Sequence, residues 1–130
     1  MKLIVKFHVI LCTLLLLSSC QVTDPLLFPK SIAMTASPST ITTSQNLKLV
    51  ATVVFEGVEG SPDQFSVRFL NGTKILAEGV VSGDKTVTKD IPVTKSMNGV
   101  LTIKAKVFFP GNPDALNIES QPVTVTVNIP

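Results

Sequence analysis

The feature that most constrains this sequence is a strict alternation of apolar and polar residues. It is clearest near the end of the chain, where Val123, Val125, Val127 and Ile129 alternate with Thr124, Thr126 and Asn128. Successive side chains of a β-strand point to opposite faces, so this pattern puts one apolar face against a core. Valine and threonine are branched at Cβ and fit strands better than helices. The pattern predicts an all-β fold and argues against a helical bundle.

Similar patterns recur from Ser31 onward, separated by turn residues. The residues expected to point inward are Ile32, Met34 and Ala36; Leu47, Leu49, Ala51, Val53 and Phe55; Phe65, Val67 and Phe69; and Leu101, Ile103, Ala105 and Val107. Shorter strands are expected over residues 74–77 and 86–93, and Pro92 indicates that the second lies at a sheet edge or ends there. About seven strands with a turn every 8–12 residues are typical of a two-sheet antiparallel sandwich, with a small barrel as the alternative.

Glycine-containing turns separate these strands. Asn71-Gly72 supplies the residue types of a type I′ hairpin turn, in which both central residues have positive φ. Ser82-Gly83-Asp84 and Asn98-Gly99 mark two further turns, and longer loops are expected over residues 57–63 and 110–114. The first hairpin should bring residues 65–70 beside residues 74–77.

The first twenty residues follow a different pattern. Lys2 and Lys6 accompany a mostly apolar run over residues 7–17, and Ser18, Ser19 and Cys20 follow. The run is shorter than the about 20 residues of a membrane-spanning helix. A positive start, a short apolar run and small residues are typical of a cleaved secretion signal. The pattern predicts export.

Leu17-Ser18-Ser19-Cys20 resembles the lipobox of bacterial lipoproteins. The resemblance implies that the Cys20 sulfur receives a diacylglycerol and that signal peptidase II cleaves between Ser19 and Cys20. Two or more acyl chains hold a protein stably on a membrane, because each buried methylene contributes about 0.8 kcal/mol. The alternative is an ordinary secretion signal with an incidental cysteine. Gln21 follows the cysteine, which resembles the outer-membrane address of Gram-negative lipoproteins; otherwise the outer face of the cytoplasmic membrane is implied.

Three segments are therefore expected. They are a signal peptide over residues 1–19, the lipidated Cys20 with a tether over residues 20–30, and a sandwich domain over residues 31–130. Pro25 and Pro29 favour an extended tether. The alternative is that the apolar residues 26–28 dock on the domain or on the membrane surface.

Three stretches resemble bacterial immunoglobulin-like domains. Residues 65–74 (FSVRFLNGTK) are similar to a hairpin of these domains, residues 98–105 (NGVLTIKA) to a later strand, and residues 120–127 (SQPVTVTV) to the closing strand. The resemblance implies an immunoglobulin-like sandwich of about seven strands. The chain departs from antibody domains, because it lacks tryptophan and its two cysteines, Cys12 and Cys20, precede the domain.

Few residues suit catalysis or metal binding. The only histidine, His8, lies in the leader, so histidine-based catalytic and metal sites are not expected after cleavage. Ser82 and Lys85 match an S-x-x-K motif, but Gly83 and Asp84 indicate a turn instead of the helix that this motif needs. The acidic loops over residues 56–63 and 110–119 lack the D-x-D-x-D spacing of common calcium sites. We expect no enzyme activity, no cofactor and no metal.

Charge also limits the partners. Lys2 and Lys6 lie in the leader, so nine basic residues remain beside nine acidic ones, and nucleic acid is not an expected partner. Residue parity nevertheless points Arg68, Lys104 and Lys106 outward on strands expected to be neighbours, with Lys74 joining them across the hairpin. This surface suits an acidic polymer or protein. The plain alternative is that these are solvated residues that protect sheet edges.

These features together predict a non-catalytic interaction or structural module anchored in the cell envelope. Adhesion, scaffolding or contact with an envelope protein or surface polymer would be its role, with the membrane contacted through Cys20. The alternative is a ligand-binding or inhibitor lipoprotein. In that case the loops over residues 56–63 and 110–119 would recognise a polysaccharide, calcium or a target enzyme.

Overall fold

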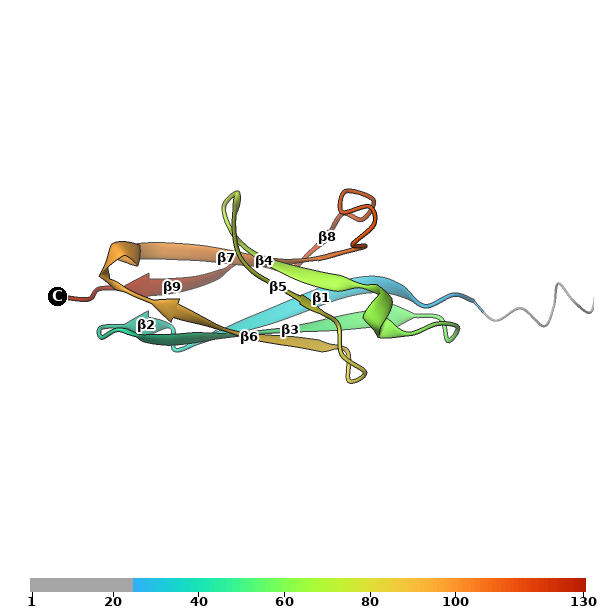
Figure 1. Ribbon diagram of the computed structural model, residues 1–130, viewed down its shortest axis with the longest axis horizontal. Helices are drawn as coiled ribbons and strands as arrows, with labels where there is room; N and C mark the ends of the chain where they lie inside the picture. Colours follow the sequence, from blue (N-terminus) through green and yellow to red (C-terminus); the bar gives the residue numbers. More distant parts are fainter. Residues whose placement is uncertain (1–24) are drawn as a thin grey trace, which may run out of the picture.

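The alternating segments form strands of two sheets that pack face to face (Figure 1). The computed structural model describes residues 25–130. Its first sheet contains β1 (Phe28–Ser37), β3 (Gln45–Glu56) and β6 (Thr86–Val93) in the order β1-β3-β6, with antiparallel pairing throughout. Pro92 lies on β6 at an edge of this sheet, as its missing N–H group predicts.

The second sheet has the order β2-β9-β7-β4-β5. Its strands are β2 (Thr40–Ile41), β4 (Ser66–Asn71), β5 (Lys74–Val80), β7 (Gly99–Phe108) and β9 (Val123–Val127), and the short β8 (Ile118–Glu119) also pairs with β7. Only the β2–β9 pair is parallel. Two 3₁₀ turns, η1 (Pro62–Gln64) and η2 (Lys95–Met97), are the helical elements of residues 25–130, which contain no α-helix. The all-β fold is confirmed.

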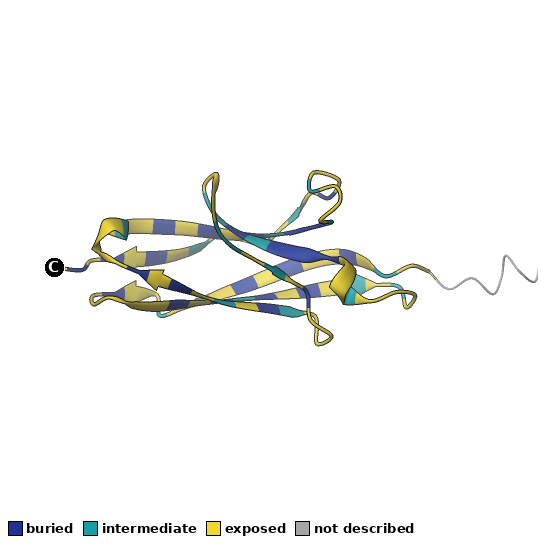
Figure 2. Ribbon diagram, viewed as in Figure 1, coloured by how far each residue is buried: buried dark blue, intermediate teal, exposed yellow. Residues whose placement is uncertain are grey.

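The core lies between the two sheets. Figure 2 shows buried and exposed residues alternating along the strands, as the sequence pattern predicts. The expected inward residues are buried, apart from Ala36, Phe55 and Val123, which are half-buried at the margin of the core. Four phenylalanine side chains pack together at one end of the core. The ring centroids of Phe28, Phe55 and Phe109 lie 6.4, 5.4 and 4.5 Å from the ring centroid of Phe65.

The β4–β5 hairpin forms where it is expected, but with a different turn. Asn71 pairs with Lys74, so Gly72 and Thr73 are the two central residues. Of these two, only Gly72 has a positive φ, of 62°. A type I′ turn needs positive φ at both positions, so that prediction is wrong. Positive φ at the first position alone, on glycine, is the feature of a type II′ turn.

A β-bulge interrupts the same hairpin. Phe69 pairs with Ala77, whereas Leu70 pairs with Ile75, so Leu76 is an extra residue on β5. An extra residue reverses the alternation of side chains beyond it. Lys74 therefore shares a face with Asn71 and not with Arg68.

The ordered domain starts earlier than the sequence boundary at Ser31. β1 begins at Phe28, and Pro29 is buried. Before it, the Leu27 N–H donates to the Glu59 carbonyl (2.6 Å), and the Pro25 carbonyl accepts from the N–H groups of Val58 (3.0 Å) and Glu59 (3.1 Å). The last six residues of the expected tether, 25–30, thus contact the rest of the domain or belong to β1.

Candidate binding surface

Three of the four basic residues singled out from the sequence lie side by side. Arg68 on β4 is directly opposite Lys106 on β7, and Lys104 is two residues away, opposite Leu70. Cross-strand partners project from the same face of a sheet. Since Val67, Phe69 and Ala105 point into the core, the three basic residues point outward. We call this outward surface of β4 and β7, with Arg68, Lys104 and Lys106, the basic face.

Lys74 does not belong to the basic face. It is the cross-strand partner of Asn71, and the bulge at Leu76 turns it to the other side of the hairpin. There it lines a depression of about 310 Å³ with residues of η2 and of the start of β7. Residue counting without the bulge puts Lys74 on the same side as Arg68, so the prediction that Lys74 belongs to this surface is wrong.

Arg68 is held on the basic face by two contacts. Its Nε donates to Glu78 Oε1 on β5 at 2.7 Å, and its guanidinium carbon lies 4.7 Å from the ring centroid of buried Phe108. A cation over an aromatic face is attracted by the ring quadrupole. The side chain of Arg68 remains 26% exposed, so it presents a positioned guanidinium at the surface.

Acidic side chains divide the basic face. Glu119 on β8 lies with its Oε2 3.7 Å from Lys104 Nζ, and in the sheet register Glu119 is opposite Lys106. With Glu78 beside Arg68, the face carries two carboxylates among three cations. The sequence pattern places neither acid on this face and assigns Glu119 to the acidic loop over residues 110–119, because β8 and the hairpin register have no periodic signal. The result is a surface of mixed charge with a small positive excess.

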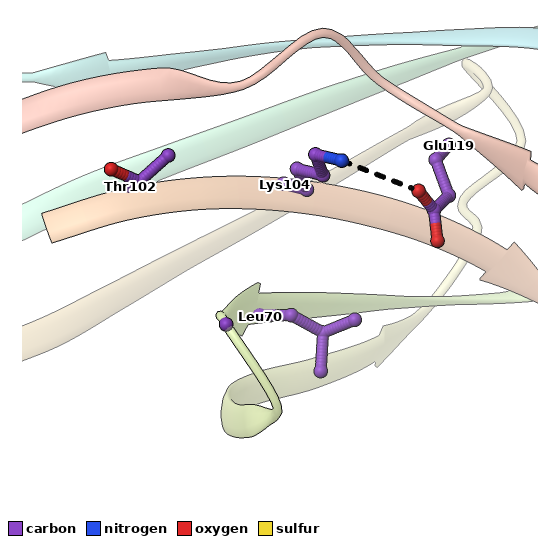
Figure 3. A pocket seen from close by; sticks show the side chains of 5 residues that line it. Leu70, Thr102, Lys104 and Glu119 are labelled. Atoms are coloured by element: carbon purple, nitrogen blue, oxygen red, sulfur yellow. Dashed lines mark ion pairs between the residues drawn. The ribbon is translucent and has the colours of Figure 1, made fainter.

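A shallow depression of about 240 Å³ lies beside the Lys104–Glu119 pair (Figure 3). It is lined by Leu70, Gly72, Thr102, Lys104 and Glu119. In Figure 3, Thr102 and Lys104 rise from the same strand, and Leu70 lies opposite them at the end of β4. The walls offer a hydroxyl, an ammonium and a carboxylate next to a leucine side chain. Such a set can hold a small polar group of a partner by hydrogen bonds.

The acidic loops do not form an evident metal site. Glu56 is paired with Lys30 (3.1 Å), and Glu119 with Lys104. Among residues 25–130, no group of three or more histidine, cysteine, aspartate or glutamate side chains is placed to hold a metal ion.

Ser82 and Lys85 of the S-x-x-K motif lie in the turn between β5 and β6. The Ser82 hydroxyl donates to the Asp84 carboxylate, and its oxygen lies 2.7 Å from the Thr86 carbonyl oxygen, while Lys85 has a φ of 67°. The helix that would place the lysine one turn from the serine is absent from this turn.

The predicted lipid-attachment residue Cys20 and the cleavage site at Ser19 lie outside the described residues. Within the described part of the chain, no helix has the length and hydropathy that crossing a bilayer requires. No known family model matches the sequence, and no curated protein matches it.

Proposed function

We propose that this protein is a lipid-anchored protein of the cell envelope whose sandwich is a non-catalytic, immunoglobulin-like interaction module. The leader supports the anchor, because Lys2 and Lys6, the apolar run over residues 7–17 and Leu17–Cys20 occur in the order that lipoprotein processing requires. An acylated cysteine would place the domain outside the cytoplasm, at the surface of a membrane.

Strand order supports the immunoglobulin-like assignment. In that fold, strands A, B and E form one sheet, and strands C, F and G form the other, often extended by C′. The order β1-β3-β6 agrees with A-B-E, and the order β9-β7-β4-β5 agrees with G-F-C-C′. β2, which pairs with β9, would be a second piece of strand A. No strand of residues 25–130 corresponds to strand D.

The basic face is the best candidate for partner contact. The observation that carries this proposal is the direct opposition of Arg68 and Lys106 on a sheet face, with Lys104 beside them. Glu78 and Phe108 hold Arg68 in place, so less side-chain entropy is lost when a partner binds. The partner we infer is an acidic segment of an envelope protein or an anionic surface polymer.

The proposal predicts that reversing charge on the basic face removes the partner. We would crosslink intact cells and purify the protein carrying Lys104→Glu and Lys106→Glu, leaving Arg68 intact because it packs on Phe108. The matched control carries Lys48→Glu and Lys95→Glu, two exposed lysines on other surfaces. Both variants change the net charge equally.

Loss of the crosslinked partner in the first variant but not in the control supports the basic face. Equal recovery from both variants would contradict it, and equal loss would point to overall charge. Increasing ionic strength should weaken partner recovery from the unchanged protein, because exposed charges are screened.

The anchor is tested separately. The mature protein should have Cys20 as its first residue, with a mass that includes a diacylglycerol, and it should sediment with membranes. Cys20→Ser should abolish both the lipid and the membrane association. A product that retains Leu17–Ser19 without lipid would contradict the anchor and leave the question of the basic face unaffected.

A further inference from the structure

Two adjacent segments expose apolar side chains at one end of the molecule. Leu26 precedes β1 and Val58 follows β3, and they are 77% and 71% exposed, the two highest values among the large exposed hydrophobic residues of residues 25–130. The start of β1 and the end of β3 lie at the same end, whereas the start of β7 and the C-terminus lie at the opposite end (Figure 1). We call Leu26 and Val58 the apolar tip.

Backbone contacts hold the tip together. The Pro25 carbonyl accepts hydrogen bonds from Val58 and Glu59, and Leu27 donates to Glu59. Gly57 has a φ of 88°, and a Cβ added there would lie 2.2 Å from the Leu26 carbonyl oxygen. Only glycine fits so close an approach at this φ. The two apolar residues are therefore displayed by a defined structure that leaves their side chains in solvent.

The tip lies close in sequence to the expected anchor. Four residues lie between Cys20 and Pro25, and the five Cα–Cα steps that join them span at most about 18 Å. If Cys20 carries lipid, the apolar tip is thus confined near the membrane surface at high effective concentration. Isolated exposed hydrophobic residues are common, but this pair is exposed at the end that would face lipid.

We propose that the apolar tip inserts into the interfacial layer of the membrane that holds the lipid on Cys20. This inference rests on the proposed lipid anchor and adds a second contact, which orients the domain. The N-terminal end then rests on the membrane, and the C-terminal end points away from it. The apolar face of an interfacial amphipathic helix is buried about 5–10 Å into the headgroup region, and we expect the two side chains of the tip to enter no deeper.

The charges around the apolar tip indicate which lipids favour its insertion. Glu59 and Asp63 are exposed nearby, whereas Lys30 and Glu56 neutralise each other in an ion pair. The local excess is negative, so attraction to anionic lipids does not drive the contact. Insertion should be favoured by zwitterionic lipid and weakened by anionic lipid at low salt.

Tryptophan fluorescence can test this contact, because the chain contains no tryptophan or tyrosine. The full-length gene is expressed, and the processed protein is reconstituted into phosphatidylcholine vesicles that contain lipids brominated near the headgroup. One variant carries Val58→Trp. The matched control carries Val100→Trp, which replaces a valine that is 64% exposed at the start of β7, at the opposite end.

Brominated lipid should reduce the fluorescence of the Val58→Trp variant about twofold, as expected for shallow insertion, and leave the Val100→Trp variant unchanged. Flotation of both variants with the vesicles reports the anchor independently. If both float but Val58→Trp is not quenched, or both variants are quenched equally, the tip contact is wrong and the anchor stands. If neither floats, the anchor fails and this inference fails with it.

Discussion

Asp84 organises the turn between β5 and β6 through a single carboxylate. Its Oδ1 accepts from the hydroxyl groups of Ser82 and Thr86, the latter at 2.7 Å, and from the Thr86 N–H group at 3.3 Å. These donors favour the charged form, and the Ser82 hydroxyl contributes most to lowering the pKa of Asp84. The sequence predicts a turn at Ser82-Gly83-Asp84, and the structure adds the reason that aspartate suits it.

Asp84→Ala should destabilise the protein in a pH-dependent way. The pKa of Asp84 is lower in the folded protein than its ordinary value of 3.8. The contribution of the Asp84 carboxylate to the free energy of unfolding is therefore complete above the ordinary pKa. It is lost as the pH falls through the lower pKa of the folded protein. The difference in urea midpoint between wild type and Asp84→Ala should stay constant from neutral pH down to about pH 5 and shrink below about pH 4.

Asp114→Ala, in an exposed loop, is the matched control for this measurement. It reports how removal of a loop carboxylate affects stability over the same pH range. A difference for Asp84→Ala that stays undiminished in acid would show that the carboxylate does not stabilise the turn through its charge.

Single residues were predictable wherever local alternation decides their orientation. The inward faces of β3, β4 and β7 follow directly from the sequence, because parity along an uninterrupted strand needs no knowledge of its partner. The orientation of Lys74 could not be predicted in this way. Its side depends on the extra residue Leu76, and no residue type in the hairpin marks that position as a bulge.

At the scale of elements, the long strands were predictable and the short ones were not. β2 and β8 contain two residues each, too few to show a period. β2 nevertheless brings Ile41 into the core by pairing with β9, and β8 brings Glu119 to Lys104. The basic residues of the candidate surface could therefore be predicted from the sequence. The positions of its two acidic residues follow only from the pairing of β5 with β4 and of β8 with β7.

Gly79 sets how closely β5 approaches β6, which belongs to the other sheet. A Cβ at Gly79 would lie 2.7 Å from Val87 Cγ1 and 2.8 Å from Lys89 Cε. Gly79→Ala should therefore lower the free energy of unfolding by about 1–3 kcal/mol, because Val87 is buried and cannot move freely. Urea denaturation followed by circular dichroism measures the loss.

Two further variants separate crowding from other effects of alanine. Gly111→Ala, at a glycine with open space around it, should change stability by less than about 0.5 kcal/mol. In a Val87→Ala background, the additional loss from Gly79→Ala should be smaller, because the clashing methyl group is gone. An undiminished loss in that background would contradict contact with Val87 as its cause.

At the scale of the whole molecule, an aromatic cluster joins the two sheets at the end where β1 begins. Phe28 and Phe55 come from β1 and β3 of the first sheet, whereas Phe65 and Phe109 flank β4 and β7 of the second. Each of the other three rings lies within 6.4 Å of the Phe65 ring. Phe28, which precedes the boundary that the sequence pattern placed at Ser31, therefore contributes one of the four rings.

The two boundaries predict different stabilities for shortened chains. A fragment of residues 31–130 lacks Phe28, buried Pro29 and the ion pair of Lys30, whereas a fragment of residues 25–130 keeps them. Burial of these side chains and the contact between Phe28 and Phe65 should make the longer fragment more stable by about 2–4 kcal/mol. Phe28→Ala in the longer fragment should account for part of that difference. Equal urea midpoints for the two fragments would place the boundary at Ser31 after all and would make residues 25–30 a tether that only rests on the domain.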